Sequence, residues 1–365
     1  MGMKRILYYG LSENPGGIET YLYKIAKHID RTAFSLAFID ETGGKACFRK
    51  ELEALGADFF DITPRRNSIF QNRCDLDQLF ASERFDVLHY NVNTLSYIEP
   101  LQQAYKHGVR IILHSRNSAT NTHFHTRLLH WIHKKALNKM DVKRLAVSKL
   151  AGEWLFGKDT PYRIINNGVE IERFAFSEEK RRKFRQRESL EGKKVYTNIG
   201  IFLPVKNQRM VVDIFSEIYK KDKTSVLLLV GDGPMKADVQ EKVEAFNLTD
   251  CVEFMGRRND VPDILCASDC LLFPSLYEGF PNAILEAETS GLPIVMSDQI
   301  TDEVMILSNC CKKSLEEEPG SWAEMAIGLV EECNDYLRID AAEIIRKNGF
   351  SVEEEILKLQ EIYGG

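Results

Sequence analysis

The sequence predicts an α/β protein made of two doubly wound domains in series, each with a parallel sheet covered by helices on both faces. Short apolar runs alternate with segments of helical periodicity from the first residues onward. This alternation stops once, at about residues 168–192, and then resumes. The 365 residues also exceed the length at which single cores stop growing. Two such domains facing each other make a cleft, and parallel sheets bind ligands beyond the carboxyl ends of their strands.

We expect seven strands in the first domain, residues 1–168, because the runs are continuously apolar, as in strands buried on both faces. These runs are residues 5–10, 35–40, 58–62, 87–91, 110–115, 144–148 and 162–166. Helical periodicity separates them, as at residues 17–29 and 95–108. Residues 351–363 form an amphipathic pattern, so we expect a C-terminal helix at 350–365 to pack back on the first domain.

The second domain is expected at residues 169–349. Its strands are predicted at residues 194–200, 225–231, 251–256, 270–275 and 293–297. The segment 168–192, with the charged run at 178–183, is interpreted as the linker about which the domains close.

Charge divides unevenly along the chain. Residues 1–169 hold 24 Lys and Arg against 17 Asp and Glu, whereas the remainder holds 24 against 37. Residues 101–150 alone hold ten basic residues and one acidic residue. This segment is either a solvated helix face or a surface that attracts an anionic partner, such as a membrane or a phosphate-bearing acceptor. Nucleic acid is disfavoured as that partner, because the chain as a whole is acidic and contains no nucleic-acid-binding motif.

No signal peptide or membrane-spanning apolar run is visible, so a soluble, cytoplasmic protein is expected, with peripheral contact at the inner face of the membrane as a further hypothesis. No metal site is predicted. The eight cysteines lack Cys-x-x-Cys spacing and are interpreted as buried, reduced thiols. We interpret Asp75-Leu76-Asp77 as an acidic cap at a helix start. Four clustered histidines are interpreted as solvent-facing helix residues rather than metal ligands: His123, His125, His130 and His133.

Several glycine-containing loops follow predicted strands. Gly16 and Gly17 stand directly before a helix, where the backbone can approach an anionic ligand closely, although the glycine pair alone favours a plain turn. After the first strand of the second domain come Lys206, which can neutralise a diphosphate, and Asn207, which can brace the loop. Gly231 lies in the turn at 230–234, which is either a nucleotide loop or a tight turn between strand and helix.

The most informative stretch is SLYEGFPNAILEAETSGLPIVMSD, residues 275–298. Asn282 is expected to cap a helix that ends at Gly291, and free backbone N–H groups at its start offer a seat for a phosphate. One turn in, Glu286 can accept hydrogen bonds from two neighbouring hydroxyls, as on ribose. Glu278 lies on the other side of that seat, where a second sugar could bind. The spacing therefore predicts one carboxylate for each of two sugars, with phosphates between them.

Several motifs, in this order, resemble glycosyltransferase family 4. They are GGIE (16–19), NNGVE (166–170), KN (206–207), GDGP (231–234), the region of Asp260-Val261-Pro262, and above all EGFPNAILE (278–286). The resemblance spans residues 6 to 363. It implies that the protein is a retaining enzyme of the GT-B fold, in which two Rossmann-like domains face each other across a cleft. Many members of the family build bacterial surface polysaccharides. It implies no metal and no cofactor beyond a nucleotide-sugar co-substrate, for which UDP is the expected nucleotide, and a glycan or lipid-linked acceptor.

The resemblance also implies roles for individual residues. Catalytic roles fall to Glu278, which would contact the donor sugar, to Lys206, which would pair with the departing diphosphate, and to His114 near the reacting sugar. Donor binding would use Glu286 for the ribose, and it would also involve Gly279, Phe280, Pro281, Asn282, Asn207, Gly16, Gly17, Gly231, Arg257 and Arg258. Of these, Arg257 and Arg258 would border the base.

One position departs from the family. Members usually carry arginine directly after the glycine of the Lys206 loop, and here that position is Ile201. Either another cation, such as Arg209 or Arg258, substitutes, or the protein binds nucleotide sugars with weak or lost turnover. A third alternative is another enzyme on the same fold, such as an epimerase or phosphorylase, which the two-glutamate loop disfavours. A dehydrogenase is disfavoured because both glycine-rich loops lack a third glycine.

Overall fold

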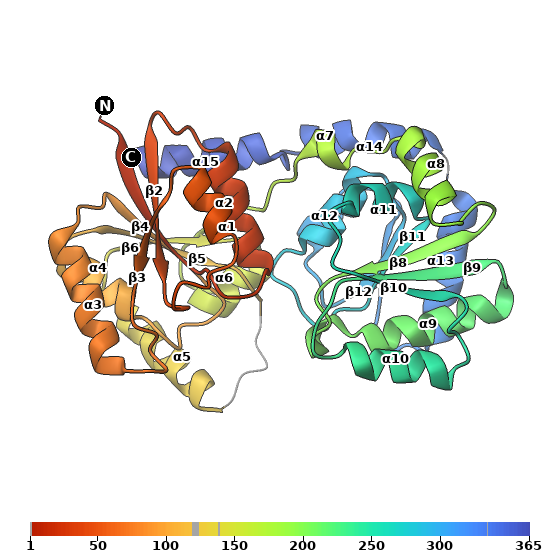
Figure 1. Cartoon of the computed structure of the whole chain (residues 1–365), viewed down its shortest axis with the longest axis horizontal. Helices are drawn as coiled ribbons and strands as arrows, with labels where there is room; N and C mark the ends of the chain where they lie inside the picture. Colours follow the sequence, from red (N-terminus) through yellow and green to blue (C-terminus); the bar gives the residue numbers. More distant parts are fainter. Residues whose placement is uncertain (1, 119–123, 138, 334) are drawn as a thin grey trace. The chain divides into compact units, whose positions relative to one another are not determined.

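The computed structural model describes residues 2–118, 124–137, 139–333 and 335–365. The chain divides into two compact units, which are described separately (Figure 1). Unit 1 comprises Met1–Asn167 together with Val352–Gly365, and unit 2 comprises Gly168–Ser351. Each unit holds one parallel sheet with helices, so the predicted α/β class with two parallel-sheet domains is confirmed.

The sheet of unit 1 has seven parallel strands in the order β3-β2-β1-β4-β5-β6-β7. The strands are β1 (Lys4–Tyr9), β2 (Phe34–Asp40), β3 (Asp58–Asp61), β4 (Val87–Val92), β5 (Arg110–Ser115), β6 (Val142–Ala146) and β7 (Arg163–Ile164). All six residues of β4 are buried, which agrees with a strand covered on both faces. From β1 the chain adds β2 and β3 on one side of the sheet and then β4 to β7 on the other, so the loops that follow β1 and β4 flank the topological switch point of unit 1.

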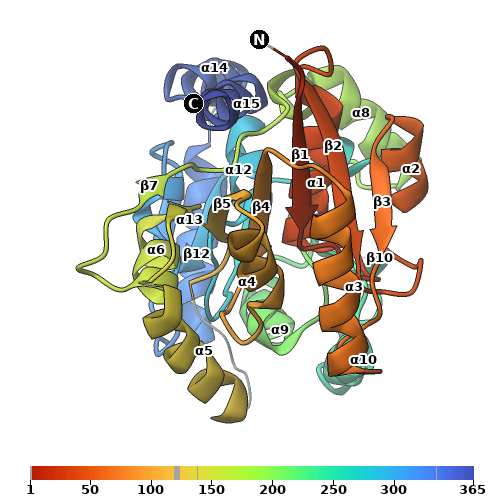
Figure 2. The same cartoon turned by 90° about the vertical axis from the view of Figure 1, so that its left-hand side faces the viewer.

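Helices of unit 1 pack on this sheet (Figure 2). They are α1 (Gly17–His28), α2 (Arg49–Ala54), α3 (Ile69–Ser82), α4 (Glu99–Lys106), α5 (Phe124–Leu137), α6 (Lys149–Phe156) and the final helix α15 (Val352–Gly364). The apolar side of α15, including Ile356 and Leu359, is buried in the core of unit 1. Lys24 and Glu355 add an ion pair of 2.8 Å between α1 and α15. Lys4 on β1 donates to the carbonyls of Tyr363 and Gly364, so the chain ends at the amino edge of the sheet.

The sheet of unit 2 has six parallel strands in the order β10-β9-β8-β11-β12-β13. The strands are β8 (Lys194–Ile199), β9 (Ser225–Val230), β10 (Val252–Gly256), β11 (Cys270–Phe273), β12 (Ile294–Ser297) and β13 (Cys310–Lys313). Its helices are α7 (Ile171–Phe174), α8 (Glu178–Arg187), α9 (Gln208–Lys221), α10 (Lys236–Ala245), α11 (Val261–Ala267), α12 (Asn282–Thr289), α13 (Pro319–Glu332) and α14 (Asp335–Lys347). The switch point lies between β8 and β11.

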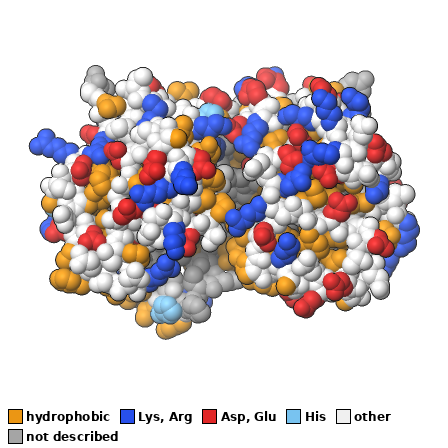
Figure 3. Space-filling model, in the orientation of Figure 1, with side chains coloured by type: hydrophobic (Ala, Val, Ile, Leu, Met, Phe, Trp, Pro, Cys, Tyr) orange, Lys and Arg blue, Asp and Glu red, His pale blue; other side chains and the backbone are white. Residues whose placement is uncertain are grey.

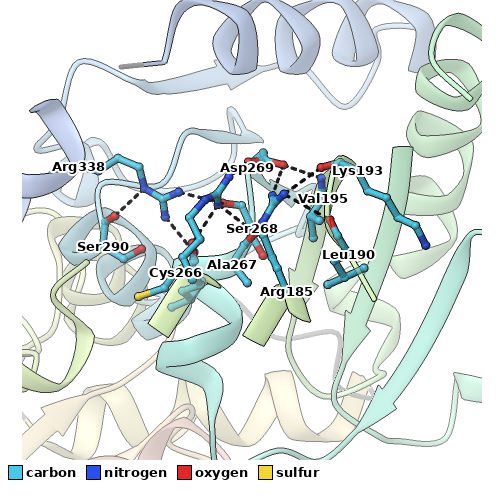
Figure 4. Close-up of polar contacts among 12 residues, drawn as sticks. Arg185, Leu190, Lys193, Val195, Cys266, Ala267, Ser268, Asp269, Ser290 and Arg338 are labelled. Atoms are coloured by element: carbon cyan, nitrogen blue, oxygen red, sulfur yellow. Dashed lines mark hydrogen bonds and ion pairs between the residues drawn. The ribbon is translucent and has the colours of Figure 1, made fainter. Parts of the chain in front are cut away.

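The segment interpreted as a linker is instead a built part of unit 2. Two arginines one turn apart on α8, Arg181 and Arg185, pair with the two oxygens of Asp269 at 2.6 and 2.7 Å. They also donate to carbonyls at the carboxyl end of α11, as does the buried Arg338 from α14 (Figure 4). Cations thus satisfy carbonyls that a helix end leaves without partners. Since Phe184 of α8 is buried as well, the charged run at 178–183 belongs to a docked helix.

Two smaller expectations are wrong, and one strand was missed. Asp75 and Asp77 lie in the middle of α3, whose N-cap is Ser68, and they bind Thr63 and Lys106 instead of capping a helix. The cysteines are not all buried: Cys251, Cys266, Cys270 and Cys310 are, whereas the other four are exposed or half-buried. The strand β13 was not predicted at all. Among the described helices, none is long and apolar enough to cross a membrane.

Candidate functional site

Loops of four neighbouring strands line the carboxyl edge of the unit 2 sheet. In the order of the sheet they follow β10, β9, β8 and β11, and they carry Arg257, Gly231, Lys206 and Glu278 respectively. The last two loops flank the switch point, where adjoining loops diverge and leave room for a ligand. The structure therefore brings the Lys206 loop and the Glu278 loop together at the edge where a ligand is expected.

Lys206 and Glu278 form the centre of this site. The Lys206 ammonium lies 2.5 Å from a carboxylate oxygen of Glu278, and both side chains are largely buried, at 20% and 16% exposure. Two further bonds lock the loops together: Asn207 Nδ2 donates to the Pro274 carbonyl at 3.2 Å, and the N–H of Leu276 donates to the Val205 carbonyl at 2.8 Å. The predicted bracing role of Asn207 is confirmed. A lysine held this way offers a fixed positive charge beside a carboxylate that can accept hydroxyl hydrogen bonds.

Close backbone contacts hold the loop after β9 against the loop after β8. A Cβ on Gly231, whose φ is +134°, would lie 2.0 Å from the Gly200 carbonyl oxygen. The Phe202 N–H donates to the Asp232 carbonyl at 3.1 Å, and the Met235 N–H donates to the Phe202 carbonyl at 3.0 Å. Any side chain at Gly231 would push these loops apart, so this glycine shapes the site through the protein's own packing.

Helix α12 begins beside the ion pair and carries Glu286, half-buried, just over one turn in. The N-cap position is Pro281, which provides no side-chain cap hydrogen bond, and Asn282 is the first helical residue. The expected Asn282 cap is therefore wrong, because the helix starts one residue earlier than a capping asparagine would require. Gly279 is buried, and Phe280 stacks on Phe350 with ring centroids 5.9 Å apart, which fixes the loop before the helix.

The arginines considered as substitutes for a missing cation are held by carboxylates. Arg258 forms a bidentate ion pair with Asp260, with N···O distances of 2.6 and 2.7 Å, and Arg209 pairs with Asp238 at 2.5 Å. This pairing, chiefly the hydrogen bond from Arg258, lowers the pKa of Asp260 to about 2. Arg257 is exposed next to Arg258 on the loop after β10. Position 201 itself is a half-buried isoleucine whose carbonyl accepts a hydrogen bond from Gln208.

Helix α12 also carries a buried carboxyl group, Glu288, that was not predicted from the sequence. Glu288 of α12 is fully buried, and its Oε1 accepts hydrogen bonds from the N–H groups of Ile306 and Leu307, both at 2.9 Å. Its Oε2 has no hydrogen-bond partner among the described residues. Burial raises the pKa of Glu288 to about 7. The signal was present in the sequence, since Glu288 follows Ile284 by four positions on the apolar stripe of the helix.

Stability is expected to depend on the ionisation of Glu288. A carboxyl group whose pKa is raised by folding binds its proton more tightly in the native state, so stability falls as pH rises from the ordinary value near 4.5 towards 7. The loss amounts to about 3 kcal/mol at most. We expect Glu288→Gln to remove this dependence and to be more stable than wild type at pH 8. Calorimetric melting at pH 5.5 and 8 tests this, and an unchanged pH dependence in the variant would contradict it.

In unit 1, Gly16 and Gly17 lie at the start of α1, on the loop that follows β1. Gly16 occupies the N-cap position, and a Cβ there would approach the end of the Glu19 side chain to 2.8 Å. A Cβ on Gly17 would meet no atom within 4 Å. The protein's own packing therefore does not require a glycine at position 17, which leaves this start of α1 open to a ligand.

His114 lies in a buried chain of hydrogen bonds. Its Nδ1 is 3.1 Å from His89 Nε2, and His89 Nδ1 is 2.6 Å from the Tyr363 hydroxyl of α15. Its Nε2 faces Arg116 at 3.4 Å, and Arg116 lies over the Tyr21 ring. Burial, and then the charge of Arg116, lowers the pKa of His114 well below its ordinary value, so the ring is neutral. The ring is not exposed in this structure, and its contact with a sugar stays a prediction.

The histidines of α5 were expected to face solvent, and for two of them this is wrong. His130 is buried against Trp154 and accepts a hydrogen bond from the Leu95 N–H at 3.1 Å, while His133 bonds the Leu95 carbonyl at 2.6 Å. His125 is exposed, and His123 lies outside the described residues. Within the described ranges no three His, Cys, Asp or Glu side chains are grouped as metal ligands. The two inner histidines instead fasten α5 to the loop after β4.

Comparison with family models gives a match for each unit. Residues 15–173 match the model described as Glycosyltransferase Family 4, and residues 193–331 match the one described as Glycosyl transferases group 1. Each unit's sheet thus falls largely within one of the two matches.

Individual relatives agree with these matches. EpsF of Bacillus subtilis, named as a glycosyltransferase, is 25% identical over 99% of this chain and 96% of its own. The UDP-Gal:alpha-D-GlcNAc-diphosphoundecaprenol alpha-1,3-galactosyltransferase of Escherichia coli is 37% identical over 37% of this chain and 36% of its own. Among solved structures, HepE of Anabaena, crystallised with UDP and glucose, superposes with a TM-score of 0.83 at 20% identity, covering 99% of both chains.

Proposed function

This chain belongs to glycosyltransferase family 4 and has the GT-B fold, and on that premise we propose that it transfers a sugar from a UDP-sugar to a hydroxyl of a lipid-linked or other glycan acceptor, with retention of the anomeric configuration. The observation that carries the proposal is the Lys206–Glu278 ion pair at the switch point of unit 2. This ion pair joins the loop before α9 to the loop before α12. Lys206, Glu278 and, on α12, Glu286 therefore belong to the two segments that follow β8 and β11 at the carboxyl edge of the sheet.

In this proposal Lys206 balances the negative charge that develops on the diphosphate as it leaves. Its ammonium is already positioned by Glu278, so little reorganisation is needed when the bond breaks. The N–H groups at the start of α12 add positive potential from the helix dipole. The bond from the anomeric carbon to the diphosphate oxygen breaks, the bond to the acceptor oxygen forms, and the acceptor proton passes to the departing phosphate oxygen.

The two glutamates give the donor its orientation. Glu286 would hold two ribose hydroxyls, each bond contributing roughly 1.5–3 kcal/mol because the acceptor is charged. Glu278, already bound to Lys206, would accept from a hydroxyl of the transferred sugar. The exposed Arg257, with Arg258 beside it, would border the base, while the open start of α1 at Gly17 would receive the donor or the acceptor. Lys206 supplies the cation for the leaving group, so we propose that transfer needs no metal and persists in EDTA.

Two relatives support the choice of substrates. HepE was crystallised with UDP and glucose, and the Escherichia coli galactosyltransferase takes its name from a UDP-sugar donor and a diphosphoundecaprenol-linked acceptor. An acceptor of that kind resides in a membrane. We therefore propose that the protein works in polysaccharide assembly at the cytoplasmic face of the membrane, with peripheral contact through the basic stretch at 101–150.

Product stereochemistry tests the proposed reaction. The protein would be incubated with UDP-glucose, UDP-galactose and UDP-N-acetylglucosamine in turn, each with GlcNAc-diphosphoundecaprenol, in buffer containing EDTA. Nuclear magnetic resonance of the product reports the anomeric configuration through the coupling between the first two sugar protons. We expect an α-linked product from the α-linked donor, and a β-linked product would contradict the retaining assignment.

A second candidate function is a nucleotide-sugar-binding protein with weak or lost transfer. It is favoured by Ile201 and by the pairing of Arg209 and Arg258 with carboxylates, which leaves Lys206 as the cation assigned to the diphosphate. Under this alternative Ile201→Arg adds a second cation and raises transfer by about tenfold or more. If turnover is high in wild type and does not rise in the variant, this second candidate fails.

A further inference from the structure

The cation at the centre of the unit 2 site is already neutralised by the protein itself. The Lys206 ammonium lies 2.5 Å from a carboxylate oxygen of Glu278. It also lies over the buried ring of Phe273, 5.2 Å from the centre of that ring. Within the described part of the chain, Glu278 is the only carboxylate that pairs with Lys206. Without a ligand, the pair therefore presents almost no net charge to an approaching phosphate.

The surroundings of this pair add little positive charge. Position 201 is an isoleucine, and Arg209 and Arg258 are both paired with aspartates. The chain from residue 170 onward holds 24 Lys and Arg against 37 Asp and Glu. Figure 3 shows basic and acidic side chains intermixed over the visible face of unit 2, in the right-hand half of the view. The attraction of a phosphate to this site therefore depends on local groups, above all on whether the charge of Lys206 is available.

Glu278 stays beside Lys206 because the two loops that carry them are fastened to each other. The Asn207 side chain donates to a carbonyl of the Glu278 loop at 3.2 Å, and the N–H of Leu276 donates to a carbonyl of the Lys206 loop at 2.8 Å. The N–H bonds of an ammonium diverge tetrahedrally, so a phosphate oxygen bound to Lys206 would lie about 4 Å from the Glu278 carboxylate. Like charges at that separation repel each other appreciably near a protein surface.

UDP and a UDP-sugar differ in how they meet this carboxylate. The terminal phosphate of UDP carries a charge of about −1.5 to −2 at neutral pH, because its second pKa lies near 6. In a UDP-sugar the same phosphate is esterified and carries a single charge. The sugar also brings hydroxyl groups, which can donate hydrogen bonds to Glu278. Glu278 therefore repels UDP more strongly than it repels the nucleotide sugar, and only the nucleotide sugar compensates it with hydrogen bonds.

From this geometry we propose that Glu278 makes unit 2 select the intact nucleotide sugar over the nucleoside diphosphate that the reaction leaves behind. Binding of the donor exchanges partners: Lys206 pairs with the diphosphate, while Glu278 accepts from a sugar hydroxyl. Once the sugar has been transferred, Glu278 loses that hydroxyl and pairs with Lys206 again, which weakens the hold on UDP and favours its release. The inference rests on the proposed function and adds the release of product to it.

Ile201 is part of this selection. An arginine at that position would add a positive charge that Glu278 does not neutralise, and such a charge attracts the doubly charged phosphate of UDP more than the singly charged phosphate of the donor. The isoleucine therefore leaves the choice between donor and product to the Lys206–Glu278 pair.

Titration calorimetry without acceptor tests the selection, with UDP, UDP-glucose, UDP-galactose and UDP-N-acetylglucosamine as ligands. We expect at least one UDP-sugar to bind wild type at least about tenfold more tightly than UDP does. Glu278→Gln should bind UDP at least about tenfold more tightly than wild type does, because the amide still accepts a hydroxyl hydrogen bond but no longer repels the phosphate. The preference for the UDP-sugar should then shrink to about threefold or less.

Two further variants complete the experiment. Ile201→Arg should strengthen the binding of UDP more than that of the UDP-sugar. The matched control is Glu217→Gln, which removes a carboxylate that pairs with Lys220 at 2.6 Å further along α9, and it should keep the affinities of wild type. Melting of each variant without ligand reports whether it is folded.

The outcomes separate this inference from the proposed function. If folded Glu278→Gln keeps the preference of wild type, the sugar's own contacts explain the preference, and the inference is wrong while the proposed function stands. The same conclusion follows if UDP binds wild type as tightly as every UDP-sugar. If Glu278→Gln does not fold, an unchanged ratio of the two affinities in Ile201→Arg overturns the inference. Binding of neither UDP nor any UDP-sugar to wild type removes the proposed function, and the inference with it.

Discussion

Lys206→Met is expected to lower kcat for sugar transfer by about 10²- to 10³-fold, the usual effect of removing one group that stabilises the charge of a leaving group. Methionine keeps most of the volume of the side chain but removes the ammonium that Glu278 positions. KM for the donor should change less than kcat, because the charge on the diphosphate increases as the bond breaks. Steady-state kinetics with the UDP-sugar that gives product tests this.

The matched control is Arg209→Met. It removes a cation from the same segment, but Arg209 is bound to Asp238 and is half-exposed, so transfer should change less than threefold. If Arg209→Met is as damaging as Lys206→Met, Arg209 substitutes for the missing cation at position 201. A Lys206→Met protein with normal kcat would contradict the assigned role of Lys206.

Asp269→Asn is expected to reduce the free energy of unfolding by about 3–5 kcal/mol, as breaking a buried ion pair usually does. Asp269 is 12% exposed and faces Arg181 and Arg185, and it also accepts a hydrogen bond from the Val195 N–H at the start of β8. Without its charge two arginines lose their counter-ion. The melting transition of a unit of this size should fall by roughly 10 °C. Differential scanning calorimetry measures this shift.

Asp260→Asn provides the comparison, since its pair with Arg258 is more exposed and is worth about 1 kcal/mol or less. Burial acts to raise the pKa of Asp269, but Arg181 and Arg185 outweigh it and the net pKa is lowered. A lowered pKa means that this stabilisation is present at neutral pH and is lost as pH falls below the ordinary range of aspartate. Wild type and Asp269→Asn should therefore converge in acid, and equal stability at pH 7 would contradict the account.

Most of the fold could be predicted because a buried parallel strand is marked by a continuous run of apolar residues in the sequence. The run SVLLLV is buried throughout as β9, as its continuous apolar sequence predicts. Strand β13 was missed because its residues, Cys-Cys-Lys-Lys, lie at the edge of the sheet and are mostly half-buried. Helix α8 was read as a linker because its charges suggest solvent. Its arginines bind carbonyls of α11, far away in the sequence, and no local pattern reports that.

In the candidate site, too, some residue contacts could be predicted from the sequence and others could not. Lys206, Asn207 and Glu278 come together because each follows a strand next to the switch point, a consequence of strand order that the sequence can predict. The surroundings of His114 could not be predicted in this way. They depend on His89 from the neighbouring strand and on Tyr363 from the last helix, which is 249 positions away from His114.

The central claim, a nucleoside-diphosphate site in unit 2 built around Lys206, Glu278 and Glu286, is tested most directly by thermal stabilisation. UDP, GDP, ADP and NAD would be added to wild type and to Glu286→Ala. A ligand at about 100 times its Kd adds roughly 2.7 kcal/mol to the stability of the native state. We expect UDP to raise the melting temperature of wild type and to have little effect on Glu286→Ala. If none of the four ligands stabilises wild type, or if UDP stabilises both proteins equally, the site described for unit 2 is contradicted.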